Sequence, residues 1–218
     1  MSKKATIWLA GCYPREQYDF YRERLSAALA ESMVVAVDAA LILFTEFKAR
    51  PHVLLGDFDS IEPQLLEEYS DCEQVIFDSD KDKTDGELAL RYLLERGYEK
   101  IEIFGAIDCE FESDQMLANF FALHAAREYP QSQVRLVDHR QQIYLVESRA
   151  LRLAGKPGNG VSVLPMSDEV VVSISGVRWP LEKARVEFGS TWPLRNEFVE
   201  SEVAIAIDGR AVVVHRYA

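Results

Sequence analysis

Short apolar runs alternate with longer amphipathic segments through the first two thirds of the chain. The runs are closed by polar turn residues, which is typical of buried strands, and the segments between them carry helical patterns. We expect strands at residues 6–10, 33–37, 53–55, 74–77, 101–104 and 134–137. We expect helices at residues 15–31, 63–69, 85–96 and 114–128. This alternation predicts a mostly parallel sheet with helices on both faces.

The pattern changes after about residue 139. A turn-rich stretch at 154–160 divides short runs of alternating polarity, which lie at 142–146, 161–164, 170–174, 184–188, 203–207 and 211–215. Closely spaced strands with turn signals are typical of a small β-sandwich or barrel. We therefore expect an α/β N-terminal domain of residues 1–140, followed by a small all-β sandwich or barrel domain of residues 141–218.

Two acidic motifs follow neighbouring predicted strands. The first acidic motif, residues 56–60, reads Gly-Asp-Phe-Asp-Ser, and the second, residues 81–85, reads Lys-Asp-Lys-Thr-Asp. Ligands of open α/β sheets bind at the carboxyl ends of the strands, so we expect these carboxylates to converge on one edge. Carboxylates at close range repel each other unless a cation separates them. Oxygen-rich clusters suit Mg²⁺, which usually arrives with substrate phosphates.

The first acidic motif places two carboxylates two residues apart. In an extended chain Asp57 and Asp59 would lie on the same side, with Phe58 turned the other way. Ser60 is expected to cap the following helix or to add an oxygen ligand. Asp-x-Asp alone also occurs in metal-dependent glycosyltransferases, in dehalogenase-type phosphatases and in plain turns. The pairing of the two motifs is therefore what indicates a site.

The second acidic motif leads into the best-specified helix of the chain. Thr84 is the expected N-cap, Glu87 completes a capping box, and Gly97 is a natural residue to end the helix. Asp85 falls in the first turn, where a carboxylate also complements the helix dipole without any further role. Lys81 supplies a positive charge that can neutralise a phosphoryl group in transfer.

A third carboxylate is expected at the same edge. Asp38 directly follows the predicted strand 33–37. The chain contains neither a Walker-type glycine loop nor a G-x-G-x-x-G sequence, so the usual backbone cradles for phosphate are absent. Metal and side chains must then hold any nucleotide.

Charge and cysteine content narrow the possible partners. The net charge is −12, so the chain has no global electrostatic footprint for nucleic acid or for anionic membranes. Its three cysteines are widely separated and lack metal-type spacing, which favours reduced thiols. The apolar run near the N-terminus is too short for a signal sequence, and no stretch approaches a membrane span. We therefore expect a cytoplasmic protein that binds neither nucleic acid nor membrane.

Several motifs together resemble one family. Residues 56–61 read Gly-Asp-Phe-Asp-Ser-Ile, and residues 81–90 contain Lys-Asp-x-Thr-Asp-x-Glu-Leu-Ala-Leu. Residues 176–181, 188–191 and 196–197 add Gly-Val-Arg-Trp-Pro-Leu, Phe-Gly-Ser-Thr and Asn-Glu. In this order, over nearly the whole chain, these elements resemble the thiamine pyrophosphokinase family.

The resemblance implies both an architecture and a reaction. The family joins an α/β domain that binds ATP and Mg²⁺ to a β-sandwich that holds thiamine, and it forms homodimers with sites between subunits. It transfers pyrophosphate from ATP to the hydroxyl of thiamine, which gives thiamine diphosphate and AMP. One aspartate near that hydroxyl would act as general base, with Asp59, Asp82 and Asp85 as candidates.

The resemblance also implies site residues by matching position. The catalytic residues would be Asp57, Asp59, Asp82 and Asp85, of which Asp57, Asp59 and Asp82 would bind the metal. The ATP side would comprise Asp38, Ser60, Lys81, Thr84, Asp114 and Asn119. The thiamine side would comprise Ser190, Trp192 and Asn196. Trp192 could stack on an aromatic ring, or equally be a core or dimer-interface residue.

The chain departs from the family pattern at several positions. Ala39 or Ala40 stands where the family has glycine, and Arg195 replaces a serine. The segment 105–119 is two residues longer, with Glu112 and Gln115 in place of an arginine and a histidine. Loss of a cation beside phosphates is not conservative. These departures leave two alternatives open: a related pyrophosphokinase for another hydroxymethyl heterocycle such as a pterin, or a non-catalytic ligand-binding relative.

Overall fold

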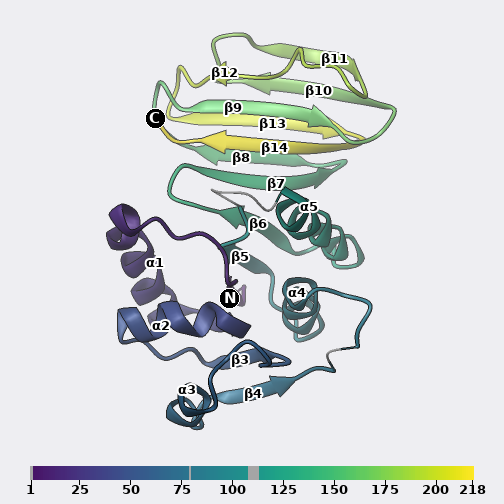
Figure 1. Ribbon diagram of the computed structural model, residues 1–218. Coiled ribbons are helices and arrows are strands. Elements are labelled where there is room, and N and C mark those ends of the chain that lie inside the picture. The colour runs from purple at the N-terminus through teal and green to yellow at the C-terminus, as the bar shows by residue number, and fades with distance from the viewer. Residues whose placement is uncertain (1, 79, 108–112) are drawn as a thin grey trace. The chain divides into compact units, whose positions relative to one another are not determined.

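The computed structural model describes residues 2–78, 80–107 and 113–218. The chain divides into two compact units, Met1–His139 and Arg140–Ala218. Their elements are labelled in Figure 1. Among the described residues, no helix is both long enough and apolar enough to cross a membrane.

The first unit is built on a parallel sheet. Its strands lie in the order β6-β5-β1-β2-β3-β4, and every pair between them is parallel. Their bounds are β1 Lys4–Trp8, β2 Met33–Val37, β3 Val53–Gly56, β4 Glu73–Ile76, β5 Lys100–Phe104 and β6 Gln133–Val137. The α/β fold expected from the sequence is thereby confirmed, since each predicted strand is present within a few residues of its expected bounds.

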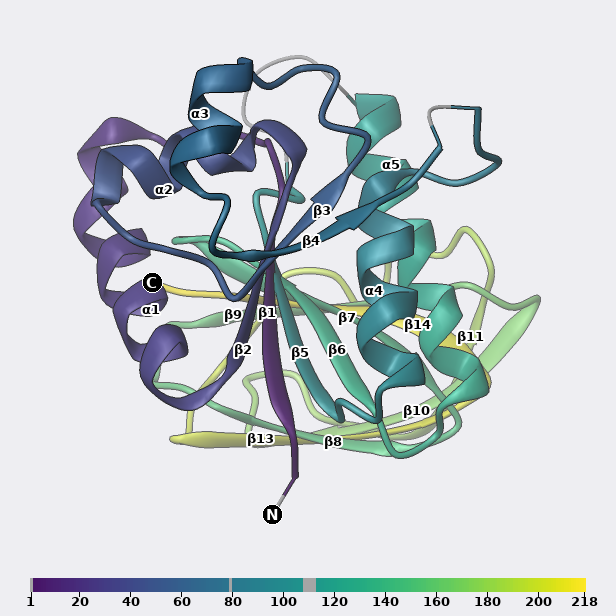
Figure 2. The same cartoon turned by 90° about the horizontal axis from the view of Figure 1, so that it is seen from below.

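Helices cover both faces of this sheet. In Figure 2, α1 and α2 lie on one side of the central strands and α4 and α5 on the other. The helices are η1 Arg15–Gln17, α1 Tyr18–Glu31, η2 Asp38–Ala40, α2 Leu41–Phe47, α3 Pro63–Glu68, α4 Asp85–Glu95, α5 Ser113–Ala122 and η3 Leu123–Glu128. The central strands are buried along nearly their whole length, which explains their continuous apolar runs.

Three details of the first unit differ from the sequence-based expectation. The first strand ends at Trp8 instead of residue 10, because the Gly11 amide donates to the Leu9 carbonyl at 2.8 Å and turns the chain. The short helix α2 was not predicted, since its apolar run is brief and lacks a side-chain cap. The expected helix 114–128 is divided into α5 and η3.

The chain order places a topological switch point between β1 and β5. The chain runs from β1 outward to β4 on one side, then returns to β5 on the other side of β1. Two glycines after these strands touch there, because a Cβ on Gly11 would lie 1.8 Å from the Gly105 carbonyl oxygen. Switch points of this kind are where open α/β sheets bind ligands.

The second unit is an antiparallel β-sandwich, as the sequence predicts. One sheet has the order β12-β9-β14-β7 and the other the order β11-β10-β13-β8. The bounds are β7 Gln141–Glu147, β8 Ala150–Ala154, β9 Gly160–Pro165, β10 Glu169–Ser175, β11 Leu181–Glu187, β12 Asn196–Glu197, β13 Glu202–Asp208 and β14 Arg210–Arg216. Strands of both sheets contribute to one apolar cluster, which is the core between them. Of these strands, β8 and β12 were not predicted.

Candidate active site

The first acidic motif is a turn, not an extended segment. Phe58 has a φ of 61° and a buried ring, and the Asp57 Oδ1 accepts a hydrogen bond from the Asp59 amide at 3.3 Å. This is the bond of an Asx turn. The expectation that Asp57 and Asp59 lie on one side of an extended chain is therefore wrong.

Ser60 does not cap the following helix. The N-cap of α3 is Glu62, which makes no side-chain cap bond, and Pro63 occupies the first turn. Proline suits that position because its missing amide would be unpaired there in any case. Ser60 itself is exposed, and its use as an oxygen ligand stays a prediction.

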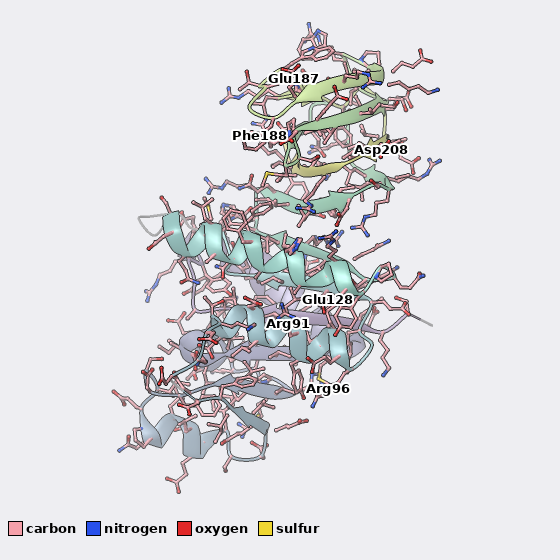
Figure 3. All side chains as sticks on the ribbon, turned by 90° about the vertical axis from the view of Figure 1, so that its right-hand side faces the viewer. Arg91, Arg96, Glu128, Glu187, Phe188 and Asp208 are labelled. Atoms are coloured by element: carbon pink, nitrogen blue, oxygen red, sulfur yellow. The ribbon has the colours of Figure 1, made fainter. Side chains whose placement is uncertain are left out.

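Thr84 caps α4 as predicted, but the expected capping box is not formed. The Thr84 Oγ1 accepts a hydrogen bond from the Glu87 amide at 3.2 Å. The Glu87 carboxylate does not return to Thr84 but binds the Arg91 guanidinium at 2.8 Å, one turn along the helix face seen in Figure 3. At the other end Gly97 has a φ of 75° and forms a Schellman motif, in which Tyr98 donates to the Leu93 carbonyl.

Lys81 joins the two acidic motifs. Its Nζ lies 3.2 Å from the Asp57 Oδ2 and 2.7 Å from the Asp85 Oδ1. The three side chains are 15%, 18% and 21% exposed, so this is a partly buried cluster. Burial lowers the pKa of Lys81, but its bonds to Asp85 and Asp57 outweigh that effect and raise the pKa overall. The convergence of the motifs on one edge, which the sequence predicts, is thus present.

Asp57 is held in its ionised form. The hydrogen bond from the Asp59 amide is the largest influence and lowers the pKa of Asp57. Partial burial acts in the opposite direction, and the Lys81 ammonium adds to the lowering. The carboxylate is therefore negatively charged at neutral pH and available to a cation.

Asp38 belongs to the same cluster but is strained and harder to ionise. Its φ is 46°, and its Oδ1 accepts a hydrogen bond from the Phe58 amide at 3.3 Å. Burial, and next the charge of Asp85, raise the pKa of Asp38 to about 6. A buried carboxylate beside other carboxylates gains from any cation placed among them.

A cavity of about 380 Å³ opens beside this cluster. It lies at the carboxyl ends of β1, β2 and β5 and at the N-terminus of α4. Its lining residues are Leu9, Ala10, Gly11, Cys12, Val37, Asp38, Thr84, Asp85, Gly86, Gly105, Ala106, Gln115, Met116 and Asn119. Four of the predicted site residues are thus among its walls. Gly11 was not among the predicted site residues, although its place just beyond a predicted strand is the signal that could have identified it.

Asn119 is one of the α5 residues that line the cavity. Its side chain is 5% exposed. The Asn119 Nδ2 donates to the Ala106 carbonyl at 3.2 Å, and its Oδ1 accepts a hydrogen bond from the side-chain amide of Gln115 at 3.2 Å. Asp114 is exposed and accepts a hydrogen bond from the Gln115 backbone amide. Glu112 lies outside the described residues.

The predicted thiamine-side residues lie between β11 and the end of β12. Asn196 is 7% exposed. Its Oδ1 accepts a hydrogen bond from the Trp179 amide at 3.1 Å, and its Nδ2 donates to the Trp179 carbonyl at 2.7 Å. Trp192 is 61% exposed, so it is not a core residue of the second unit. Ser190 is half-buried and accepts a hydrogen bond from the Trp192 amide at 3.3 Å.

Two family models match this chain. The model of the thiamin pyrophosphokinase catalytic domain matches residues 26–136, and that of the thiamin pyrophosphokinase vitamin B1 binding domain matches residues 148–212. The chain belongs to the thiamine pyrophosphokinase family. The first match contains the Lys81 cluster, and the second contains the predicted thiamine-side residues.

Individual members of the thiamine pyrophosphokinase family agree with this assignment. The enzyme of Bacillus subtilis is 25% identical over 171 residues, which cover 77% of this chain and 78% of that protein. Thiamin pyrophosphokinase 1 of Caenorhabditis elegans is 26% identical over 191 residues, covering 78% and 72%. The crystal structure of the Bacillus subtilis protein has a TM-score of 0.82 at 22% identity and covers 99% of both chains, which shows the same fold.

The oxygen atoms of the Lys81 cluster fit a hard divalent cation. The Asp85 Oδ1 is buried, and the Lys81 ammonium lies 2.7 Å from it as an ion pair. Carboxylate oxygens that already face a positive charge, with a second carboxylate nearby, are the hard ligands that Mg²⁺ prefers. Among the described residues no three acidic, histidine or cysteine side chains stand at metal-binding spacing. The cluster would therefore have to rearrange to hold an ion.

Proposed function

We propose that this protein transfers the pyrophosphoryl group of ATP to the hydroxyl of thiamine, with Mg²⁺, to give thiamine diphosphate and AMP. The observation that carries the proposal is the convergence of Asp57 and Asp85 on Lys81 beside the cavity. Membership of the family supports the choice of thiamine as acceptor. The alternative of a pterin substrate has no support in the site.

The cavity is the proposed site of the ATP phosphates. The first turn of α4 lines it through Thr84, Asp85 and Gly86, and a helix N-terminus offers unpaired amides and a positive dipole end. Gly11 and Gly105 line the cavity at the switch point, and their close backbone approach leaves no room for a side chain on Gly11. The overall negative charge of the protein makes such local donors necessary.

The carboxylates of the two acidic motifs are the proposed metal ligands. Asp57 and Asp85 already face a common cation, while Asp59 and Asp82 are exposed on the same two turns. A bound Mg²⁺ would neutralise charge on the phosphate oxygens. Lys81 would bind the transferring group, and Asp38 would add negative charge at the floor of the site.

An aspartate must also accept the proton of the attacking hydroxyl. Of the three candidates, Asp85 lines the cavity, whereas Asp59 and Asp82 are not among its lining residues. Asp85 is also a proposed metal ligand, which lowers its basicity, so all three aspartates stay candidates for the general base.

The second unit is the proposed thiamine-binding part. The exposed indole of Trp192 offers a stacking face, and Ser190 a hydroxyl beside it. The family resemblance supports a homodimer with sites between subunits. A cytoplasmic location is proposed from the separated cysteines, of which Cys12 and Cys72 are free thiols.

One assay tests the proposed reaction. The purified protein is mixed with MgCl₂, ATP and thiamine, and AMP and thiamine diphosphate are quantified together. Equal amounts of the two products are expected, and omission of thiamine should leave ATP intact. AMP formed only with a pterin alcohol would refute the substrate, and the absence of both products would refute the reaction.

A further inference from the structure

The Lys81 ammonium lies between the two acidic motifs, in the position where a metal ion would contact both. Its Nζ contacts one carboxylate at the end of β3 and another in the first turn of α4. The ammonium is a single positive charge between two carboxylates, and a third carboxylate, Asp38, accepts a hydrogen bond from the Phe58 amide next to Asp57. The cluster is thus only partly neutralised.

We propose that Lys81 is an internal counter-ion, which holds Asp57 and Asp85 together before substrates bind and must leave them when the divalent ion binds. This inference rests on the metal-dependent reaction proposed above. It assigns Lys81 a positioning role in the ligand-free protein in addition to its expected contact with phosphate.

The competition follows from charge and space. Mg²⁺ binds oxygen at about 2.0–2.1 Å and demands near-ideal octahedral geometry. An ammonium at 2.7 Å from the buried Asp85 Oδ1 occupies the approach to that oxygen. An ammonium and a metal ion bound to the same carboxylate oxygen would repel each other. Lys81 is only 15% exposed, so water screens that repulsion weakly. The ammonium must therefore move before Asp85 can coordinate the ion.

Displacement of the Lys81 ammonium would couple the binding of the metal ion to the binding of the nucleotide. Metal alone must break both contacts of Lys81 and leave its charge without a partner. When nucleotide is present, the phosphate oxygens in the adjacent cavity offer the ammonium new partners. The ion and the nucleotide should then each raise the affinity of the other, because both favour the same displaced state of Lys81.

Lys83 provides a matched control. It lies two residues along the same turn, carries the same charge and is exposed. Within the described part of the chain no ion pair involves it. A Gln substitution at either position removes one positive charge, so a difference between the two variants reports the contacts of Lys81 and not the net charge.

The test measures metal binding without turnover. Mn²⁺ affinity of the nucleotide-free protein is determined by electron paramagnetic resonance for wild type, Lys81→Gln, Lys83→Gln and Lys81→Arg. We expect Lys81→Gln to bind Mn²⁺ about tenfold more tightly than wild type, because two unpaired carboxylates favour a cation. Lys83→Gln and Lys81→Arg should stay within about threefold of wild type, since both keep a cation in the cluster.

Equal Mn²⁺ affinity of Lys81→Gln and Lys83→Gln would overturn the proposal, as would failure of every variant to bind Mn²⁺. Thermal melting establishes that each variant is folded, and Lys81→Met, which keeps the aliphatic stem, replaces the Gln variant if that one unfolds. The measurement involves neither thiamine nor product. A wrong substrate assignment would therefore leave the expected affinities unchanged.

Discussion

Gly56 leaves the space that the Asp38 carboxylate fills. A Cβ on Gly56 would lie 1.7 Å from the Asp38 Oδ1, far inside any van der Waals contact. The same oxygen accepts a hydrogen bond from the Phe58 amide. The Asp38 side chain therefore connects the end of β2 to the turn after β3. The glycine of the first acidic motif is thus required by Asp38 and not only by the turn.

Gly56→Ala should destabilise the fold and remove activity together. The φ of 152° disfavours a side chain, and the methyl group must displace Asp38, so we expect a loss of more than about 2 kcal/mol in the free energy of unfolding. Gly97→Ala is the control, because Gly97 also has a positive φ but no atom within 4 Å. It should cost about 1–2 kcal/mol and leave the rate unchanged. Urea unfolding and product formation measure both, and equal costs for the two variants would contradict the argument.

Asp38 should make the metal-free protein less stable as pH rises. Its pKa of about 6 exceeds the ordinary 3.8, so the folded state holds the proton more tightly than the unfolded state. The stability linked to that proton is fully present below pH 3.8 and is lost as the pH rises through about 6.

Asp38→Asn removes this dependence while keeping the acceptor for the Phe58 amide. In EDTA, the free energy of unfolding of the variant minus that of wild type should rise by about 1–3 kcal/mol from pH 4.5 to pH 7.5. Urea unfolding at the two pH values measures the gain. A constant difference between the two proteins would mean that Asp38 titrates normally.

The meeting of the acidic motifs was predictable, but their conformation was not. Parallel strands end at one edge, so strand order alone brings Asp57 toward Asp85. The positive φ of Phe58 and of Asp38 depends on ring burial and on a hydrogen bond between segments twenty residues apart. Aspartate is enriched at positive φ, so Asp38 carried a weak local signal, whereas a bulky residue such as Phe58 adopts this conformation only when tertiary contacts enforce it.

Asp57→Asn and Asp82→Asn should each abolish turnover with the fold intact. Asn keeps the shape of the side chain but lacks the charge that binds Mg²⁺, and both residues lie on exposed or half-exposed turns. Circular dichroism and melting check the fold, and thiamine diphosphate formation checks activity. Near-normal activity in both variants would remove the argument for a metal at the acidic motifs.

Thr84→Ala should loosen the first turn of α4. Loss of the bond from the Glu87 amide is expected to cost about 1 kcal/mol, and Thr84→Ser should retain it. Because that turn lines the cavity, the Ala variant should also raise KM for ATP. Urea unfolding and steady-state kinetics measure the two effects. Equal stability of the Ala and Ser variants would show that the cap contributes nothing.

Two features, the Gly11–Gly105 contact and the role of Asn196, could not be predicted from the sequence. Gly11 and Gly105 meet across two strands, which requires the strand order to be known first. Asn196 was selected as a ligand for thiamine, yet its amide satisfies both backbone groups of Trp179, seventeen positions earlier. A motif match cannot distinguish these roles, because both demand the same side chain.

Asn196 and Trp192 should therefore respond differently to truncation. Asn196→Ala leaves the Trp179 backbone groups without their partner and should cost about 1–3 kcal/mol in the free energy of unfolding. Trp192→Ala should change stability by less than about 0.5 kcal/mol, since the indole is exposed, but raise KM for thiamine if the ring stacks on the substrate. Asn196→Asp keeps the acceptor and should fall between Asn196→Ala and wild type. Urea unfolding beside thiamine kinetics separates the roles, and an Asn196→Ala protein as stable as wild type would show that Asn196 does not hold this loop.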